Sequence, residues 1–245
     1  MTAVARAAGA EWLKFRTLAA GPITATAAFT LIVGLAAMLL VARAGHDVTP
    51  ATTELLAGVS WAQLLLAVLA VVTICSEWAS GTSKVTFLAV PTRWPVLTGK
   101  VAVVGGIAFV AGTTGAAGAL AMGAATGLDV GAQPALTIRL VAGTGLYLGT
   151  IAVLALGIGA VVRDLAGSVL TVLGFLWAMP FVAGLIPVAE VQRLALYLPT
   201  SAGLALIAPD DPAAQLTPWG GYAVLLAWTA AVLAGATAAL RARDV

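Results

Sequence analysis

Six long runs of apolar residues constrain this chain more than any other feature of its sequence. The runs cover residues 22–42, 56–76, 101–125, 138–162, 166–186 and 219–240. Each matches the ~20 residues that a helix needs to cross the hydrocarbon of a bilayer. Backbone groups inside lipid must satisfy one another's hydrogen bonds, and continuous helices do so. We therefore expect an all-α integral membrane protein with six transmembrane helices, built as a single domain over residues 1–245.

The composition excludes several other classes of protein. Only 9% of the residues are charged and 61% are hydrophobic, whereas soluble domains average ~25% charged residues. A water-facing surface of ordinary size cannot be built from this chain. Cys75 is the only cysteine, so no internal disulfide is expected, and the single histidine, His46, leaves no multi-histidine metal site. The net charge of +2 is too small to indicate a nucleic-acid partner.

The positions of the 12 basic residues predict how the spans are oriented. Lysine and arginine concentrate on the cytoplasmic side of membrane proteins. With six spans and a cytoplasmic N-terminus, Arg43, Arg139 and Arg193 lie outside and the other nine (12 − 3) lie inside. An odd number of spans would put Arg241 and Arg243 outside. We therefore expect both termini on the cytoplasmic side.

The first apolar run has an alternative interpretation as a cleaved signal peptide. Ala42-Arg43-Ala44 fits the A-x-A pattern of a signal-peptidase site. However, the run that begins at Pro22 is longer than the ~7–15 apolar residues of a signal peptide. The preceding segment is also long and carries both Glu11 and Lys14. An uncleaved first span is the favoured interpretation.

The interior of the spans offers only weakly polar side chains. No charged residue lies deep in any predicted span, which argues against a proton-driven transporter or an ion pump. Thr30, Gln63 and Thr73 either hydrogen-bond one helix to another or line a weakly polar pathway for an amphipathic or apolar cargo. Small residues are dense within 112–118 and 145–149, and they predict close helix packing.

No catalytic motif is recognisable in the sequence. There is no HExxH, no GxSxG and no Cys/His cluster. Gly99-Lys100 looks like the end of a phosphate-binding loop, but Trp94 and Val101 stand where that motif requires Gly and Ser or Thr. We expect neither enzymatic activity nor nucleotide hydrolysis from this chain, so any work against a gradient would need a partner.

Two segments outside the spans have helical patterns at the predicted cytoplasmic face. Residues 4–18 place Trp12 and Phe15 on one face and turn Lys14 largely away, as in an interfacial helix. Between the second and third spans, residues 80–90 predict a short helix on the membrane face. Pro91 and Pro95 bracket a break before the third span, because the residue before each proline disfavours helix.

A third segment, residues 188–212, lies between the fifth and sixth spans. Residues 188–198 have apolar positions at helical spacing, opposite Glu190 and Arg193. The apolar stretch that follows is broken by Pro199 and is too short to span a bilayer. We expect an external re-entrant or interfacial hairpin.

Taken in order, these motifs resemble those of the membrane subunit of type-2 ABC transporters, the exporter-type permeases. The resemblance covers essentially the whole chain. The matching residues are Glu11-Trp-Leu-Lys-Phe-Arg16, Ser76-Glu77, Gly81-Thr82, Leu88-Ala-Val-Pro91, Arg93, Lys100, Arg163, Tyr197-Leu-Pro-Thr-Ser-Ala-Gly203 and the Arg-x-Arg-Asp ending at Asp244.

The resemblance implies a partner-driven transport mechanism. The chain would pair with a second copy or a similar permease in a bacterial inner membrane, and a separate ATPase would bind ATP and Mg, leaving no cofactor in this chain. Residues 80–90 would be the coupling helix. The implied ATPase interface comprises Trp12, Lys14, Arg16, Glu77, Gly81, Thr82, Arg93 and Lys100. The implied external gate comprises Tyr197, Pro199, Thr200 and Gly203. The alternative is a non-transporting membrane scaffold, sensor or immunity protein.

Overall fold

All the regular secondary structure in the part of the chain that the structure describes is helical. The computed structural model describes residues 3–44, 50–79, 94–209 and 214–242, and no strand occurs among them. Six of its helical segments are long and apolar enough to cross a membrane. The expectation of an all-α, multi-pass membrane protein is therefore confirmed.

The helices follow the predicted runs closely. They are α1 (Ala3–Thr17), α2 (Ala20–Arg43), η1 (Glu54–Leu56), α3 (Val59–Ala79), α5 (Trp94–Ala125), α6 (Pro134–Val162), α7 (Leu165–Leu173), a π-helical turn η2 (Gly174–Ala178), α8 (Met179–Leu185), α9 (Ala189–Ala195), α10 (Pro199–Leu204), η3 (Ala205–Ile207) and α11 (Pro218–Ala242).

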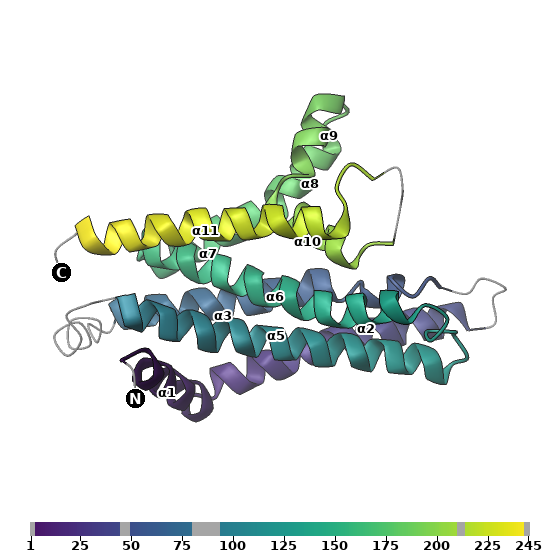
Figure 1. Ribbon diagram of the computed structural model, residues 1–245, viewed down its shortest axis with the longest axis horizontal. Coiled ribbons are helices and arrows are strands. Elements are labelled where there is room, and N and C mark those ends of the chain that lie inside the picture. The colour runs from purple at the N-terminus through teal and green to yellow at the C-terminus, as the bar shows by residue number, and fades with distance from the viewer. Residues whose placement is uncertain (1–2, 45–49, 80–93, 210–213, 243–245) are drawn as a thin grey trace.

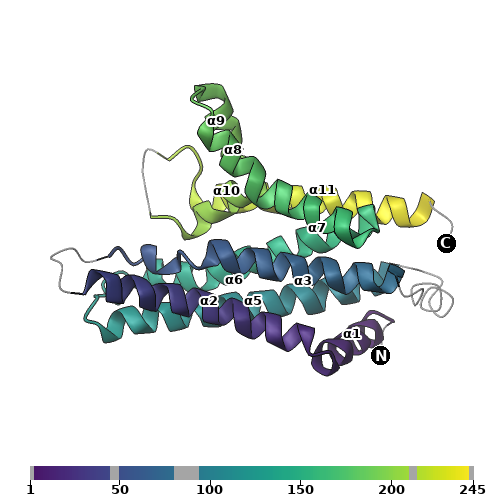
Figure 2. The same ribbon diagram turned by 180° about the vertical axis from the view of Figure 1, so that it is seen from behind.

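The long helices run side by side along one axis, and both ends of the chain lie at the same end of the bundle (Figures 1 and 2). We call this the basal end. There α1 lies against the bundle, α3 ends at Ala79 and α5 begins at Trp94. The opposite, apical end carries the turn between α5 and α6. Helix α6 is central, with 72% of its apolar stretch buried against 17% for α2.

Glycines allow α5 and α6 to pack closely, as the dense small residues predict. A Cβ atom on Gly112 would lie 2.9 Å from the Thr144 carbonyl oxygen, and one on Gly145 would lie 2.8 Å from that of Phe109. Neither backbone could approach so closely with a side chain in between. In lipid, where apolar burial does not drive helices together, this close packing stabilises the pair.

Two helices extend further at the basal end than the apolar runs predict. Helix α3 continues to Ala79, so Glu77 lies in its last turn, and α5 begins seven positions before the predicted Val101. The prediction that Pro95 belongs to a break before the third span is wrong. Proline is tolerated in the first helical turn, because its missing N–H would have no intrahelical partner there.

The fifth apolar run is not one continuous α-helix. It passes through the π-helical turn at Gly174–Ala178 and then reaches Pro180 in the first turn of α8. Helices α8 and α9 project sideways from the bundle, and α10 returns to it beside α11 (Figure 1). None of the residues of α9 is buried. The segment between the fifth and sixth spans thus contains two short helices, α9 (exposed) and α10.

Candidate functional site

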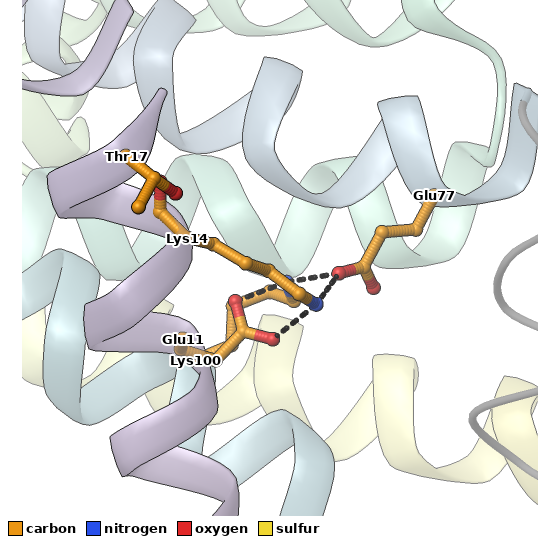
Figure 3. Close-up of polar contacts among 5 residues, drawn as sticks. All are labelled: Glu11, Lys14, Thr17, Glu77 and Lys100. Atoms are coloured by element: carbon orange, nitrogen blue, oxygen red, sulfur yellow. Dashed lines mark hydrogen bonds and ion pairs between the residues drawn. The ribbon is translucent and has the colours of Figure 1, made fainter. Parts of the chain in front are cut away.

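Four charged side chains meet at the basal end and join three helices (Figure 3). The Lys100 ammonium of α5 donates to a Glu11 carboxylate oxygen of α1 at 2.6 Å and to Glu77 of α3 at 2.9 Å. Lys14 of α1 donates to the same two carboxylates, at 2.9 Å to Glu11 and 2.6 Å to Glu77. We call these four residues the basal ion cluster.

The basal ion cluster is largely removed from solvent. The side chains of Lys100, Glu11 and Glu77 are 2%, 6% and 17% exposed, and only Lys14 is half exposed, at 46%. A buried charge is costly unless it is paired and hydrogen-bonded. Each charge here has two partners of opposite sign, so the cluster is neutral. Removing one of the four charged groups would leave a net charge in the buried cluster that no partner neutralises.

The charge of Lys14 is stabilised by this arrangement. Its burial alone would lower the pKa, but the hydrogen bonds and negative charges of Glu77 and Glu11 outweigh that effect and raise the pKa above its usual value. Lys14 therefore stays protonated at neutral pH and keeps α1 attached to the end of α3.

The end of α3 is also fixed on its other side. Trp78, the residue after Glu77, lies under the Arg163 guanidinium, whose Cζ is 4.4 Å from the ring centroid. Arg163 ends α6 in the left-handed conformation, with φ 64°. It also donates to the Ala239 carbonyl of α11 at 3.2 Å, near the negative end of that helix. Neighbouring residues thus tie α3 to α1 and α5 on one side, and to α6 and α11 on the other.

The residues of the implied ATPase interface have different positions. Trp12 and Arg16 lie on the exposed surface of α1. Lys14, Glu77 and Lys100 come together in the basal ion cluster, and Lys100 is buried there instead of facing solvent. The coupling segment 80–90 and three interface residues lie outside the described residues: Gly81, Thr82 and Arg93.

The sequence did not identify Glu11 as a member of the site. Its spacing of three from Lys14 was a usable signal, since residues at i and i+3 share a helix face. Lys100 was assigned to the loop before the third span. In the structure Lys100 belongs to α5 and is buried, near the basal end of the third span.

Three of the four residues implied for the external gate pack against the bundle centre. Pro199, Thr200 and Gly203 of α10 are buried. A Cβ atom on Gly203 would lie 2.6 Å from the Tyr147 ring of α6. The fourth, Tyr197, is 46% exposed, and its carbonyl accepts a hydrogen bond from Trp228 Nε1 at 2.9 Å.

The three polar residues that could line a pathway have different environments in the structure. Gln63 is buried and accepts a hydrogen bond from the Tyr147 hydroxyl. This bond joins α3 to α6, which is one of the two roles that the sequence allowed for Gln63. Thr30 lies on the exposed face of α2. Thr73 lines a cavity, and its hydroxyl donates to the Leu69 carbonyl at 2.7 Å.

No known protein-family model matches the sequence, and no curated protein matches it significantly. The permease resemblance thus depends on the order of short motifs. The basal ion cluster is a physical arrangement that stands independently of that resemblance.

Proposed function

We propose that this chain is the transmembrane subunit of an ABC transporter that exports an amphipathic or apolar substrate, driven by a separate ATPase subunit that binds ATP and Mg. It acts as a pair with a second copy or a similar permease in a bacterial inner membrane. The basal end faces the cytoplasm, and the hairpin of α9 and α10 lies at the external side.

One observation carries this proposal: the last turn of α3 is fixed to four other helices. Residues 80–93 connect this turn to α5, and they include the segment 80–90 that the resemblance assigns to ATPase docking. A force on that segment acts on α3 directly. Through Glu77 it acts on α1 and α5, and through Trp78 and Arg163 it acts on α6 and α11. Such a joint suits a subunit that converts a partner's closure into helix movement.

The polarity of the spans fits an apolar cargo better than an ion. Among the described residues, the charged side chains of the spans lie near their ends, as Lys100 and Glu77 do. Charges at the centre of a membrane usually mark ion or proton pathways. The weakly polar groups of the interior, such as Gln63 and Tyr147, are hydrogen-bonded to each other.

The proposal is tested by exchanging the coupling segment. Residues 80–90 are replaced by a Gly/Ser sequence of equal length, and the tagged chain is purified from its native membrane with its associated proteins. The unmodified chain should co-purify with a stoichiometric ATP-binding subunit, and the exchanged chain should insert normally and lose it. A matched exchange of residues 45–49 serves as the control. Unchanged association after the 80–90 exchange would refute the proposal.

A further inference from the structure

A deep apolar cavity of about 430 Å³ lies between α3 and α5, directly above the basal ion cluster. These two helices pack mainly on other helices and have little direct contact with each other. The walls are apolar, with Leu66 and Thr73 on one side and Val104 and Ala108 on the other, and Ala152 of α6 closes the inner end. The volume falls within the range of ligand sites, about 300–1,000 Å³.

The cavity has an exposed mouth and a buried bottom. Its lining includes the exposed residues Leu18 and Ser76 at the basal end, and the fully buried Leu66 and Ala152 at the other. Between Leu66 and Ser76, ten residues of helix rise roughly 15 Å. The cavity is thus long, apolar along its length and open near the membrane surface.

The mouth carries a cation that can bind a ligand. Lys14 lines the cavity and is the one half-exposed member of the basal ion cluster. An ammonium has three N–H donors, and the contacts to Glu11 and Glu77 use two of them. One donor is left for an acceptor at the mouth, where the Ser76 side chain is also exposed.

We infer that this cavity binds the hydrocarbon chain of a single-chain anionic amphiphile, with its carboxylate or phosphate head at Lys14. An empty apolar space of this size would forfeit dispersion contacts along all of its walls, and a dry apolar cavity excludes water. A bilayer supplies hydrocarbon chains at the depth where the cavity lies. The head group then stays at the membrane surface, where α1 and its basic residues are.

The chain alone suffices for the binding test, so the outcome is independent of the proposed transport function. Delipidated protein in neutral detergent is titrated with hexadecanoate, lysophosphatidylglycerol, hexadecanol and octanoate, and bound ligand is counted by native mass spectrometry. One equivalent of a long-chain anion should bind, and hexadecanol and octanoate should bind about tenfold more weakly or worse. Binding of hexadecanoate alone identifies a free fatty acid, and binding of lysophosphatidylglycerol alone identifies a phospholipid. Binding of neither anion overturns the inference.

Two matched variants locate the bound chain. Thr73→Phe fills the cavity, whereas Thr171→Phe adds the same ring on the exposed face of α7. The two sites are matched, because each threonine hydroxyl donates to the carbonyl four residues earlier. Thr73→Phe should weaken binding about tenfold or more, since the chain and the ring cannot share the space, and Thr171→Phe should leave binding unchanged. Equal effects of the two variants would contradict the inference.

A photolabelling experiment avoids any dependence on the folding of variants. Hexadecanoate with a diazirine near the end of its chain should label the wild-type protein at the buried end of the cavity, around Leu66 of α3, Ala108 of α5 and Ala152 of α6. Labelling confined to exposed lipid-facing residues, such as Met38 and Leu170, would mean that the chain stays outside the cavity and would refute the inference.

Discussion

At the residue scale, two buried hydrogen bonds connect helices near the base of α10. In a regular helix the Leu176 carbonyl would accept the N–H of residue 180, but Pro180 has none. Thr200 Oγ donates to that carbonyl at 2.7 Å instead. The Tyr147 hydroxyl, beside α10, donates to Gln63 of α3. The Thr200 hydrogen bond therefore joins α10 to the break in the fifth span, and the Tyr147 hydrogen bond joins α6 to α3 close by.

Tyr147→Phe should destabilise the protein by about 1–3 kcal/mol, because the Gln63 carbonyl oxygen stays buried and loses its donor. Combining it with Gln63→Leu should recover most of that loss, since both polar partners are then gone. Thermal unfolding in detergent measures both effects, with Tyr197→Phe as a control at a tyrosine that is 46% exposed. A neutral Tyr147→Phe would show that the contact does not contribute.

Alkaline pH should release α1 from the bundle through Lys14. Because the folded pKa is raised, the stabilisation is fully present below the usual pKa of 10.5 and is lost as pH rises through the folded value above it. Limited proteolysis at the junction of α1 and α2 measures the release. In Lys14→Arg the guanidinium keeps its charge beyond pH ~12, so release should move to higher pH. An identical pH profile for both proteins would exclude Lys14 as the cause.

At the element scale, the structure explains which features the sequence could predict. Hydrophobic runs located all six spans, because the need for about 20 apolar residues is a local property. Helix ends were missed where a charged residue pairs with another helix. Lys100 looked like a loop residue, since its partners, Glu11 and Glu77, are distant in sequence. The contact between Trp78 and Arg163 could not be predicted either, because it too depends on the tertiary fold. The sequence had pointed to Arg163 and to Glu77, the neighbour of Trp78, but not to their connection.

The close contact of α5 and α6 predicts opposite outcomes for two glycine substitutions. Gly145→Ala should destabilise by about 1–3 kcal/mol, because its Cβ would press against the backbone of α5. Gly235→Ala on α11 should stabilise by about 0.5–1 kcal/mol, since alanine is the better helix former and no other atom lies within 4 Å of the new Cβ. Thermal unfolding of both variants measures the difference, and a stabilising Gly145→Ala would contradict the close packing.

At the scale of the whole molecule, the two ends of the bundle have different chemical characters. The basal end joins α1, α3, α5, α6 and α11 through paired charges and the Trp78–Arg163 contact. At the apical end Arg43 pairs with Glu54, at 3.1 Å between partly exposed side chains, and such surface pairs contribute little. The paired charges gathered at the basal end support the proposal that the molecule receives force there.

The orientation of the bundle is tested by chemical labelling of intact cells. In a Cys75→Ser background, Asp129→Cys places a thiol at the exposed apical turn and Arg6→Cys places one on exposed α1. A membrane-impermeant maleimide should label the former in intact cells and the latter only after lysis. The reverse result would mean that the basal end faces outward, and it would remove the basis for a cytoplasmic ATPase partner.

The most direct test of the central claim is whether ATP-hydrolysing activity co-purifies with this chain. The tagged wild-type protein is extracted from its native membrane in a mild detergent and passed through affinity and size-exclusion columns. The account predicts Mg-dependent ATP hydrolysis that co-elutes with the chain at the size of a complex. A stable, correctly inserted chain that elutes without any ATP-hydrolysing partner would contradict it.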